Sequence, residues 1–287
     1  MTAEFEVRPI GLEQVREAVA QADLEGWEPG LSDADPFFAA DPGGFFAAEV
    51  EGRIVATISA VRCSAEVVFM GFYIVDPEVR GTGLGKALYD EIVSRPTGLT
   101  LGGDAVPEQV PNYETEGFEV AYWNARYSSV DPGADRLRHG RAGAAHLLPA
   151  SEVPFEELVE FDGSHCFGPR PGFLRLWIEG PGRDSLVTTD DSGEITGFAA
   201  SRQTSRGHRI GPVFTDDAAI AEALILELAE RVGGRVAVDV PQPNRAGVEL
   251  LEGFGMKRGF ETARIYRGPA PELPLERIFG ITSLELG

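Results

Sequence analysis

Apolar and polar residues alternate along the first half of the chain in a way that predicts short strands separated by helices. A period of two runs through residues 45–50 and 54–63, with the turn signal Glu51-Gly52 between them. A helical period follows Gly11, and the loop 27–38 is rich in Asp, Pro and Gly. Strands are expected over 5–10, 45–50, 54–63, 66–75, 98–101 and 118–127, the last completing this sheet, and helices over 12–24, 86–94 and, in short form, 107–116.

The same order of elements recurs in the second half of the chain. Residues 216–232 form a clear amphipathic pattern, with Leu224, Ile225 and Leu228 on one side. Between the halves, residues 128–150 carry no sustained apolar period and indicate a connector with room for an edge strand. A second edge strand is expected at 278–286. Further helices are expected over 155–161, 172–179 and 244–252, and further strands over 185–189, 195–202, 208–214, 235–240 and 259–267.

Composition excludes several classes of protein. The 287 residues carry a net charge of −21, a surface that repels nucleic acid and anionic membranes and favours a cationic substrate. No apolar run approaches the ~20 residues of a membrane helix, and no signal peptide is visible, so we expect a cytoplasmic protein. Two distant cysteines, Cys63 and Cys166, and four histidines without paired spacing make a metal site improbable.

The segment from Tyr73 to Asp90 predicts a phosphate-binding turn. An apolar strand is followed by Asp76-Pro77, by glycines at 81, 83 and 85, and by a helical pattern. Alternate glycines let successive N–H groups face one concavity, and the helix dipole adds positive potential. Ala87 after Gly85-Lys86 excludes a P-loop, which needs Ser or Thr there, and the third glycine comes one residue early for a dinucleotide fingerprint.

Arg80-x-x-Gly83-x-Gly85 resembles the coenzyme A loop of the GNAT superfamily of acyl-CoA N-acyltransferases, and Tyr113-Glu-Thr-Glu-Gly-Phe follows where that family has its tyrosine. In the second half, the segment from Asn244 to Met256 resembles the same landmark. The chain is therefore similar to a tandem GNAT protein with a YitH-type C-terminal domain. The resemblance implies an α/β (α+β) fold of two GNAT-like domains, each a mixed, mostly antiparallel central sheet flanked by helices.

The resemblance also implies that the two domains have different functions. Residues 1–135 would form the domain that binds acetyl-CoA and catalyses, 136–150 a linker, and 151–287 a degenerate domain, in which Asp216-Asp217 replaces the glycine loop and Leu251 the tyrosine. Asp162, His165, Arg170 and Trp177 of that domain are candidates for one wall of the acceptor pocket. The residues expected to bind the coenzyme are Tyr73, Ile74 and Val75 for the pantetheine arm, Arg80, Gly81, Thr82, Gly83, Leu84, Gly85 and Lys86 for the pyrophosphate, and Asn112 beside the tyrosine.

Two residues are candidates for acid–base chemistry. Tyr113 occupies the position of the family's general acid, which protonates the departing thiolate. Glu66 resembles the glutamate base of histone-type enzymes, but it lies 14 residues before Arg80, one more than that pattern has. A shift of one residue turns a strand side chain to the other face unless a bulge intervenes. Base catalysis through water therefore stays open.

The function implied is transfer of an acetyl group from acetyl-CoA to a primary amine by direct attack. The acceptor would be a small molecule or a protein amine, no metal is required, and the protein would be a monomer or a homodimer. The alternative is a non-catalytic acyl-CoA-binding or regulatory module. Tyr113 favours catalysis over this alternative.

Overall fold

The computed structural model describes residues 5–129 and 146–287 of the chain. Most of the expected linker, residues 136–145, lies outside these ranges, while its last residues form strand β7. The strands are β1 (Glu6–Pro9), β2 (Phe45–Val50), β3 (Arg53–Arg62), β4 (Val67–Val75), β5 (Thr100–Ala105), β6 (Glu119–Ser129), β7 (His146–Pro149), β8 (Arg183–Thr189), β9 (Ile195–Thr204), β10 (Gly207–Thr215), β11 (Val236–Pro241), β12 (Lys257–Arg267) and β13 (Ile278–Gly280). The helices are α1 (Leu12–Leu24), α2 (Ala34–Ala40), α3 (Leu84–Ser94), α4 (Val110–Thr115), α6 (Phe155–Gly163), α7 (Pro171–Glu179), α8 (Ala218–Val232) and α9 (Arg245–Gly253).

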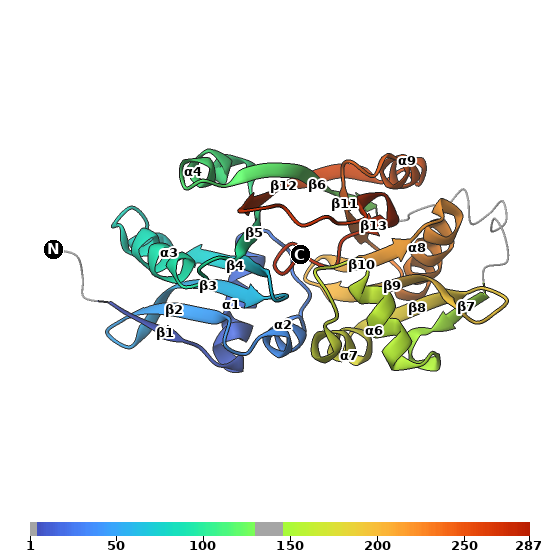
Figure 1. Ribbon diagram of the computed structural model, residues 1–287, viewed down its shortest axis with the longest axis horizontal. Coiled ribbons are helices and arrows are strands. Elements are labelled where there is room, and N and C mark those ends of the chain that lie inside the picture. Colours follow the sequence, from blue (N-terminus) through green and yellow to red (C-terminus); the bar gives the residue numbers. More distant parts are fainter. Residues whose placement is uncertain (1–4, 130–145) are drawn as a thin grey trace.

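The described strands form one continuous, mostly antiparallel sheet, with helices on both faces (Figure 1). Its order is β1-β2-β3-β4-β5-β12-β6-β11-β10-β9-β8-β7, and β13 pairs with β10 off this path. The apolar face of each helix packs on this sheet; α3, for example, buries Leu84, Leu88 and Ile92. The expected fold class, a mixed and mostly antiparallel α/β fold, is confirmed.

Strands β4 and β5 run parallel but pair over only part of their length. The pairing extends from Val67 opposite Thr100 to Met70 opposite Gly103, and the strands separate beyond it. Where they part, β4 carries a bulge: its register against β3 shifts, and Phe72 takes a φ of 49°. The Thr57 hydroxyl donates to the Phe72 carbonyl at 2.9 Å, which holds the bulge in place. The bulge redirects the side chains of the second part of β4.

The two halves of the chain exchange their last strands. β12, from the second half, pairs with β5 of the first half, and β6, from the first half, pairs with β11 of the second. β6 and β12 pair with each other between them, and Figure 1 shows both crossing from one half to the other. The expectation that residues 118–127 complete the first half's own sheet was therefore wrong. Within the continuous sheet, the strands of each half are followed by a strand from the other half.

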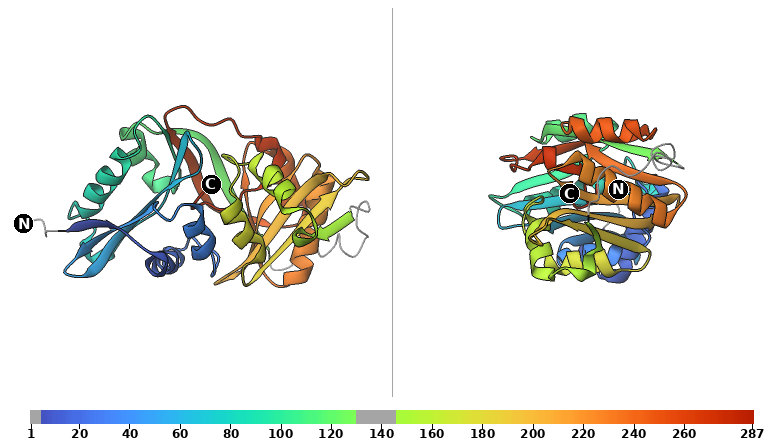
Figure 2. Two further views of the ribbon diagram at one scale, coloured as in Figure 1. Left: turned by 60° about the horizontal axis from the view of Figure 1, so that its bottom comes forward. Right: turned by 90° about the vertical axis from the view of Figure 1, so that its right-hand side faces the viewer.

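In the second half, the parallel strands β10 and β11 pair only at His208–Val236 and Arg209–Ala237. The gap beyond these pairs is occupied by β13, which pairs with β10, while the next N–H, that of Ile281, donates to the Asp239 carbonyl of β11 at 2.9 Å. The expected edge strand at 278–286 is thus a three-residue strand inside the sheet. From there the chain continues to its C-terminus between the two halves (Figures 1 and 2).

The halves also share a hydrophobic core. Phe37 of α2 lies in contact with α7, with its ring centroid 6.5 Å from that of Phe173 and 6.1 Å from that of Trp177. Two buried carboxylates of the preceding loop form ion pairs with arginines of the second half. Glu28 pairs with Arg235, and Asp33 pairs with Arg183. These contacts fix the loop 25–33 against the second half.

Candidate active site

A cavity of about 380 Å³ opens where β4 and β5 separate. Both halves of the chain line it, because β12 and the C-terminal segment close the side opposite α3. Trp27 and Phe260 provide aromatic walls, and Phe72 and Ile74 belong to the bulged part of β4. A small set of polar groups in an otherwise apolar hollow is typical of a substrate site.

The glycine turn lies at the N-terminus of α3, beside this cavity. Gly81 and Gly83 adopt left-handed φ values of 78° and 88°, and a Cβ on either would meet no atom within 4 Å. Within the described residues, the N–H groups of Gly81, Gly83 and Gly85 donate to no other backbone group. Gly85 is required for another reason, since a Cβ there would lie 2.6 Å from a methyl carbon of Val75. The turn therefore presents free donors and an open concavity, as a pyrophosphate requires.

The two cations of the motif are held in ion pairs. The Arg80 side chain donates to the Val75 carbonyl at 2.8 Å and to Glu25 at 2.5 Å, so it spans the strand end and the end of α1. Lys86 pairs with Asp90 and, at 3.2 Å, with Glu116. Both side chains lie within one turn of the free N–H groups and are about half exposed.

Tyr113 faces the cavity from α4. Its ring packs on Phe118 and on Tyr89, with centroid distances of 5.6 and 6.0 Å. Its hydroxyl forms no hydrogen bond with the described residues, and burial, with a smaller contribution from Tyr73, raises the pKa of Tyr113 to about 12. A phenol in this state is protonated at neutral pH and free to donate.

Tyr89 of α3 is a cavity residue that the sequence analysis missed. Its ring lies between Tyr73 and Tyr113, and its buried hydroxyl has no hydrogen-bond partner among the described residues. Burial raises its pKa above the ordinary tyrosine value. The signal was present in the helical spacing, because position 89 lies on the same face as Gly85.

The remaining coenzyme candidates lie around the same hollow. Tyr73, Ile74 and Val75 line the cavity, whereas Thr82 and Leu84 belong to the turn and the first position of α3. Thr82 donates to the Val79 carbonyl at 2.8 Å and so stabilises the turn. Asn112 is exposed and donates to Gln109 rather than lining the cavity.

The structure does not bring Glu66 to this site. Glu66 is exposed in the turn before β4, at the end of the strand opposite the glycine turn, and it does not line the cavity. The bulge that would have corrected its spacing lies at Phe72, six positions further along. The geometry gives no support to Glu66 as the base.

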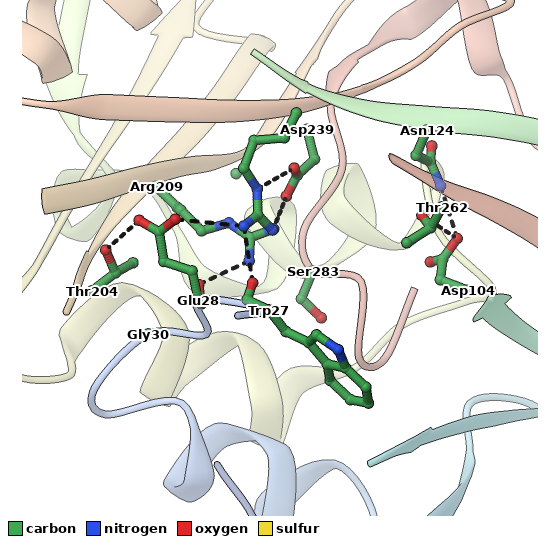
Figure 3. A network of polar contacts seen from close by, with 12 residues as sticks. Trp27, Glu28, Gly30, Asp104, Asn124, Thr204, Arg209, Asp239, Thr262 and Ser283 are labelled. Atoms are coloured by element: carbon green, nitrogen blue, oxygen red, sulfur yellow. Dashed lines mark hydrogen bonds and ion pairs between the residues drawn. The ribbon is translucent and has the colours of Figure 1, made fainter. Parts of the chain in front are cut away.

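Three other carboxylates line the cavity: those of Glu25, Asp104 and Glu285. Glu25 is engaged by Arg80. Asp104 accepts from Asn124, Thr262 and Arg264, the last at 2.8 Å, and Figure 3 shows the first two of these contacts. Glu285 comes from the C-terminal segment and is only 2% exposed. The sequence analysis named none of the three, and Glu285 reaches the site only through tertiary packing.

The second-half residues proposed for an acceptor wall have structural roles instead. Arg170 forms a two-pronged contact with the buried Asp162, at 2.7 and 2.9 Å. His165 stacks on Phe214, and Trp177 is fully buried in the shared core. None of these residues lines the 380 Å³ cavity.

Both cysteines lie away from the cavity. Cys63 and Cys166 line a separate hollow near Arg170 and Leu286. Burial raises the pKa of Cys63 to about 12 and also raises that of Cys166. Neither thiol is placed or ionised as a nucleophile for the site described here.

Comparison with known proteins places the fold and the site in one class. The Acetyltransferase (GNAT) family matches residues 12–98, and the Acetyltransferase (GNAT) domain matches residues 158–280. The chain belongs to the GNAT family and carries two such domains in tandem. It is an N-acetyltransferase of the acyl-CoA-dependent kind, and an acyl-CoA is its cosubstrate.

Among its relatives, the holothin acyltransferase of Pseudoalteromonas sp. (strain SANK 73390) is 30% identical over 98% of this chain and 94% of its own length. The N-acetyltransferase YitH of Bacillus subtilis (strain 168) is 24% identical over 91% of each chain. A putative acetyltransferase from Pyrococcus horikoshii has the same fold, with a TM-score of 0.81 at 18% identity, covering 99% of this chain and 96% of its own.

Two further observations concern accessory chemistry. In the described residues, no three His, Cys, Asp or Glu side chains are grouped so as to hold a metal ion. Among the helices described, none combines the length and apolarity needed to cross a membrane.

Proposed function

We propose that this protein transfers an acyl group, most simply acetyl, from acyl-CoA to a primary amine by direct attack in the site between β4 and β5. The observation that supports this is the position of the turn 81–85, whose free N–H groups lie beside the acid-lined cavity that Tyr113 faces. Holding two substrates in register there converts a bimolecular reaction into an effectively unimolecular one.

In this proposal the glycine turn holds the pyrophosphate, with Arg80 and Lys86 beside it, and the separated edge of β4 from Tyr73 to Val75 receives the pantetheine arm. The thioester then lies at the cavity, where Tyr113 protonates the departing sulfur. The phenol of Tyr113 is protonated at neutral pH, so it carries a proton to donate as negative charge develops on the sulfur. Residues 1–135 thus supply the coenzyme site.

Direct attack is favoured over an acyl-enzyme on cysteine, serine or lysine because the described cavity lining contains none of these side chains. An acyl-enzyme would need such a nucleophile within reach of the thioester.

The residues proposed to bind the acceptor favour a positively charged substrate. Trp27 and Phe260 lie at a second hollow that adjoins the cavity, and Glu25, Glu108 and Glu261 line that hollow as well. A protonated amine with an apolar or aromatic body fits glutamates together with aromatic rings. The hollow is shaped by loops and by the exchanged strand β12, so the acceptor is expected to be a small molecule or an exposed amine of a protein.

The test is a thiol-release assay of the full chain with acetyl-CoA and a panel of aromatic and aliphatic primary amines. The panel includes holothin, the compound in the relative's name. Matched alcohols and carboxylates serve as controls. Amine-dependent release of coenzyme A, with the acetylated amine identified by mass, supports the proposal. Acetylation of alcohols alone would overturn it.

A further inference from the structure

The C-terminal segment carries a buried carboxylate into the cavity of the other half. Glu285 lines the cavity, is 2% exposed, and neither of its side-chain oxygens has a hydrogen-bond partner within the described residues. Burying a charged group without a partner is costly, so such a group is rare unless a ligand completes it.

The backbone fixes this position from several sides. The N–H of Ile281 is bonded to β11, and the Leu286 N–H donates to Ser283 Oγ at 3.1 Å. Gly71 of β4 lies directly against the segment, because a Cβ at Gly71 would fall 2.3 Å from the Glu285 carbonyl oxygen. The close approach that this glycine permits places Glu285 beside the point where β4 and β5 part.

A buried set of charges lies behind Glu285. Arg126 donates to Asp239 at 2.8 Å and lies 3.6 Å from Glu28. Arg209 pairs with the same aspartate, and Figure 3 labels Glu28, Arg209 and Asp239. Burial lowers the pKa of Arg126 and of Arg209, and the charge of Glu285 acts against the lowering in both.

Neither guanidinium reaches the carboxylate of Glu285 within hydrogen-bond distance. The arginines therefore attract a negative charge to this position while leaving its oxygens available.

The other two cavity carboxylates are already engaged. Arg80 holds Glu25 at 2.5 Å, and Asp104 accepts from Asn124, Thr262 and Arg264. Among the described residues that line the cavity, Glu285 is thus the one carboxylate with no side-chain partner on either oxygen.

We propose that Glu285 is the catalytic residue that receives the acceptor ammonium and takes its proton, so that the last residues of the second half complete the active site of the first. This inference rests on the proposed function. The ammonium first gives one proton to Glu285. The resulting neutral nitrogen attacks the thioester carbonyl carbon and forms the C–N bond.

The C–S bond then breaks, and the sulfur takes a proton from Tyr113. One of the two protons still on the nitrogen restores Tyr113, and the other stays on the amide. The proton on Glu285 finally passes to water, so the products are amide, coenzyme A and one proton.

The test compares Glu285→Gln with wild type on the most reactive amine of the panel. We expect Glu285→Gln to lower kcat/KM for the amine by roughly 100-fold, the scale of general-base catalysis, with affinity for coenzyme A unchanged. Glu272→Gln, at an exposed glutamate earlier in the C-terminal region, is the matched control and should behave as wild type.

A second readout separates proton removal from a structural role. The same amine carrying fluorine atoms beside its carbon–nitrogen bond keeps its shape but is less basic, so it needs less help to lose its proton. The loss in Glu285→Gln should be much smaller with this acceptor. An equal loss with both acceptors, or activity within threefold of wild type, would overturn the role of Glu285 while leaving the amine transferase intact. If wild type acetylates no amine, both proposals fail.

Discussion

The two halves of this protein have the same scaffold and differ in what occupies it. In each, a strand leads into a helix and then into a parallel strand that pairs only briefly with the first: β4, α3 and β5 in one half, β10, α8 and β11 in the other. In the first half the gap between the parallel strands is a cavity. In the second, β13 fills it.

The N-termini of α3 and α8 also differ, since that of α3 is open and that of α8 is occupied. Asp217 caps α8, accepting from the N–H of Ala219 at 2.7 Å, and Asp216 pairs with Arg277 just before β13. Gly83 offers α3 no side-chain cap. One helix is thus capped by its own carboxylate, whereas the other has donors that an external anion would satisfy. A coenzyme site therefore needs an open gap and an uncapped helix, and only the first half has both among the described residues.

The largest expected effect is on the free energy of unfolding, and it concerns the exchanged strands β6 and β12 that join the halves. Asp239→Asn removes a buried carboxylate that pairs with Arg126 of the first half and Arg209 of the second. Removing the buried carboxylate that the two guanidinium groups share should cost about 3–5 kcal/mol in the free energy of unfolding. Because β6 and β12 cross between the halves, calorimetry should show a single transition at lower temperature.

The control is Asp184→Asn, which breaks a partly exposed pair with Arg231 and should cost less than about 1 kcal/mol. Two transitions that shift independently would show that the halves fold as separate units.

The second prediction concerns the proposed general acid, Tyr113, which the second half lacks. Tyr113→Phe keeps the ring packing and removes the proton donor, so kcat should fall by roughly 10²- to 10³-fold with coenzyme A affinity retained. The corresponding residue of the second half, Leu251, is fully buried in the core. Tyr127→Phe, which removes a hydroxyl outside the cavity, should leave kcat unchanged. Wild-type turnover by Tyr113→Phe would remove Tyr113 from the mechanism.

The third prediction makes the first half resemble the second. Gly83→Asp places a carboxylate at the N-terminus of α3, as in α8, and should weaken coenzyme A binding by more than ~2 kcal/mol. The matched control is Gly193→Asp, since Gly193 has a φ of 91° and equally open surroundings in a turn remote from the site. Titration calorimetry measures both. Equal affinity in the two variants would mean that the turn does not hold the phosphates.

The sequence pattern predicted most of the helices and strands. Of the site, it predicted only the part formed by residues close together in the sequence. The helix Leu12–Leu24 and the strand Phe45–Val50 have their expected limits, and the turn 81–85 has the expected open form. These features depend on neighbours in sequence.

The exchange of β6 and β12 could not be predicted in this way. Both strands have 11 residues, and the residue pattern of each is the same whichever sheet edge it joins. Glu285 was hidden for the same reason, since its burial depends on where the C-terminal segment runs. Glu66 was misplaced because a spacing rule does not show at which residue a strand bulges.

The smallest expected effect is that ionisation of Tyr113 does not lower kcat at alkaline pH. Tyr113 acts only while protonated, and its pKa is raised to about 12 by burial, so the acid form is lost only as pH rises through that value. At pH 10 an exposed tyrosine is about half ionised, whereas about 1% of Tyr113 would be. The kcat of wild type should therefore show no decline from Tyr113 between about pH 8 and 10. The phenolate absorbance of wild type minus that of Tyr113→Phe should stay near zero over the same range. A fall in kcat with a midpoint near pH 10, absent from Tyr113→Phe, would show that the Tyr113 hydroxyl lies in water rather than buried at the cavity that distinguishes the first half from the second.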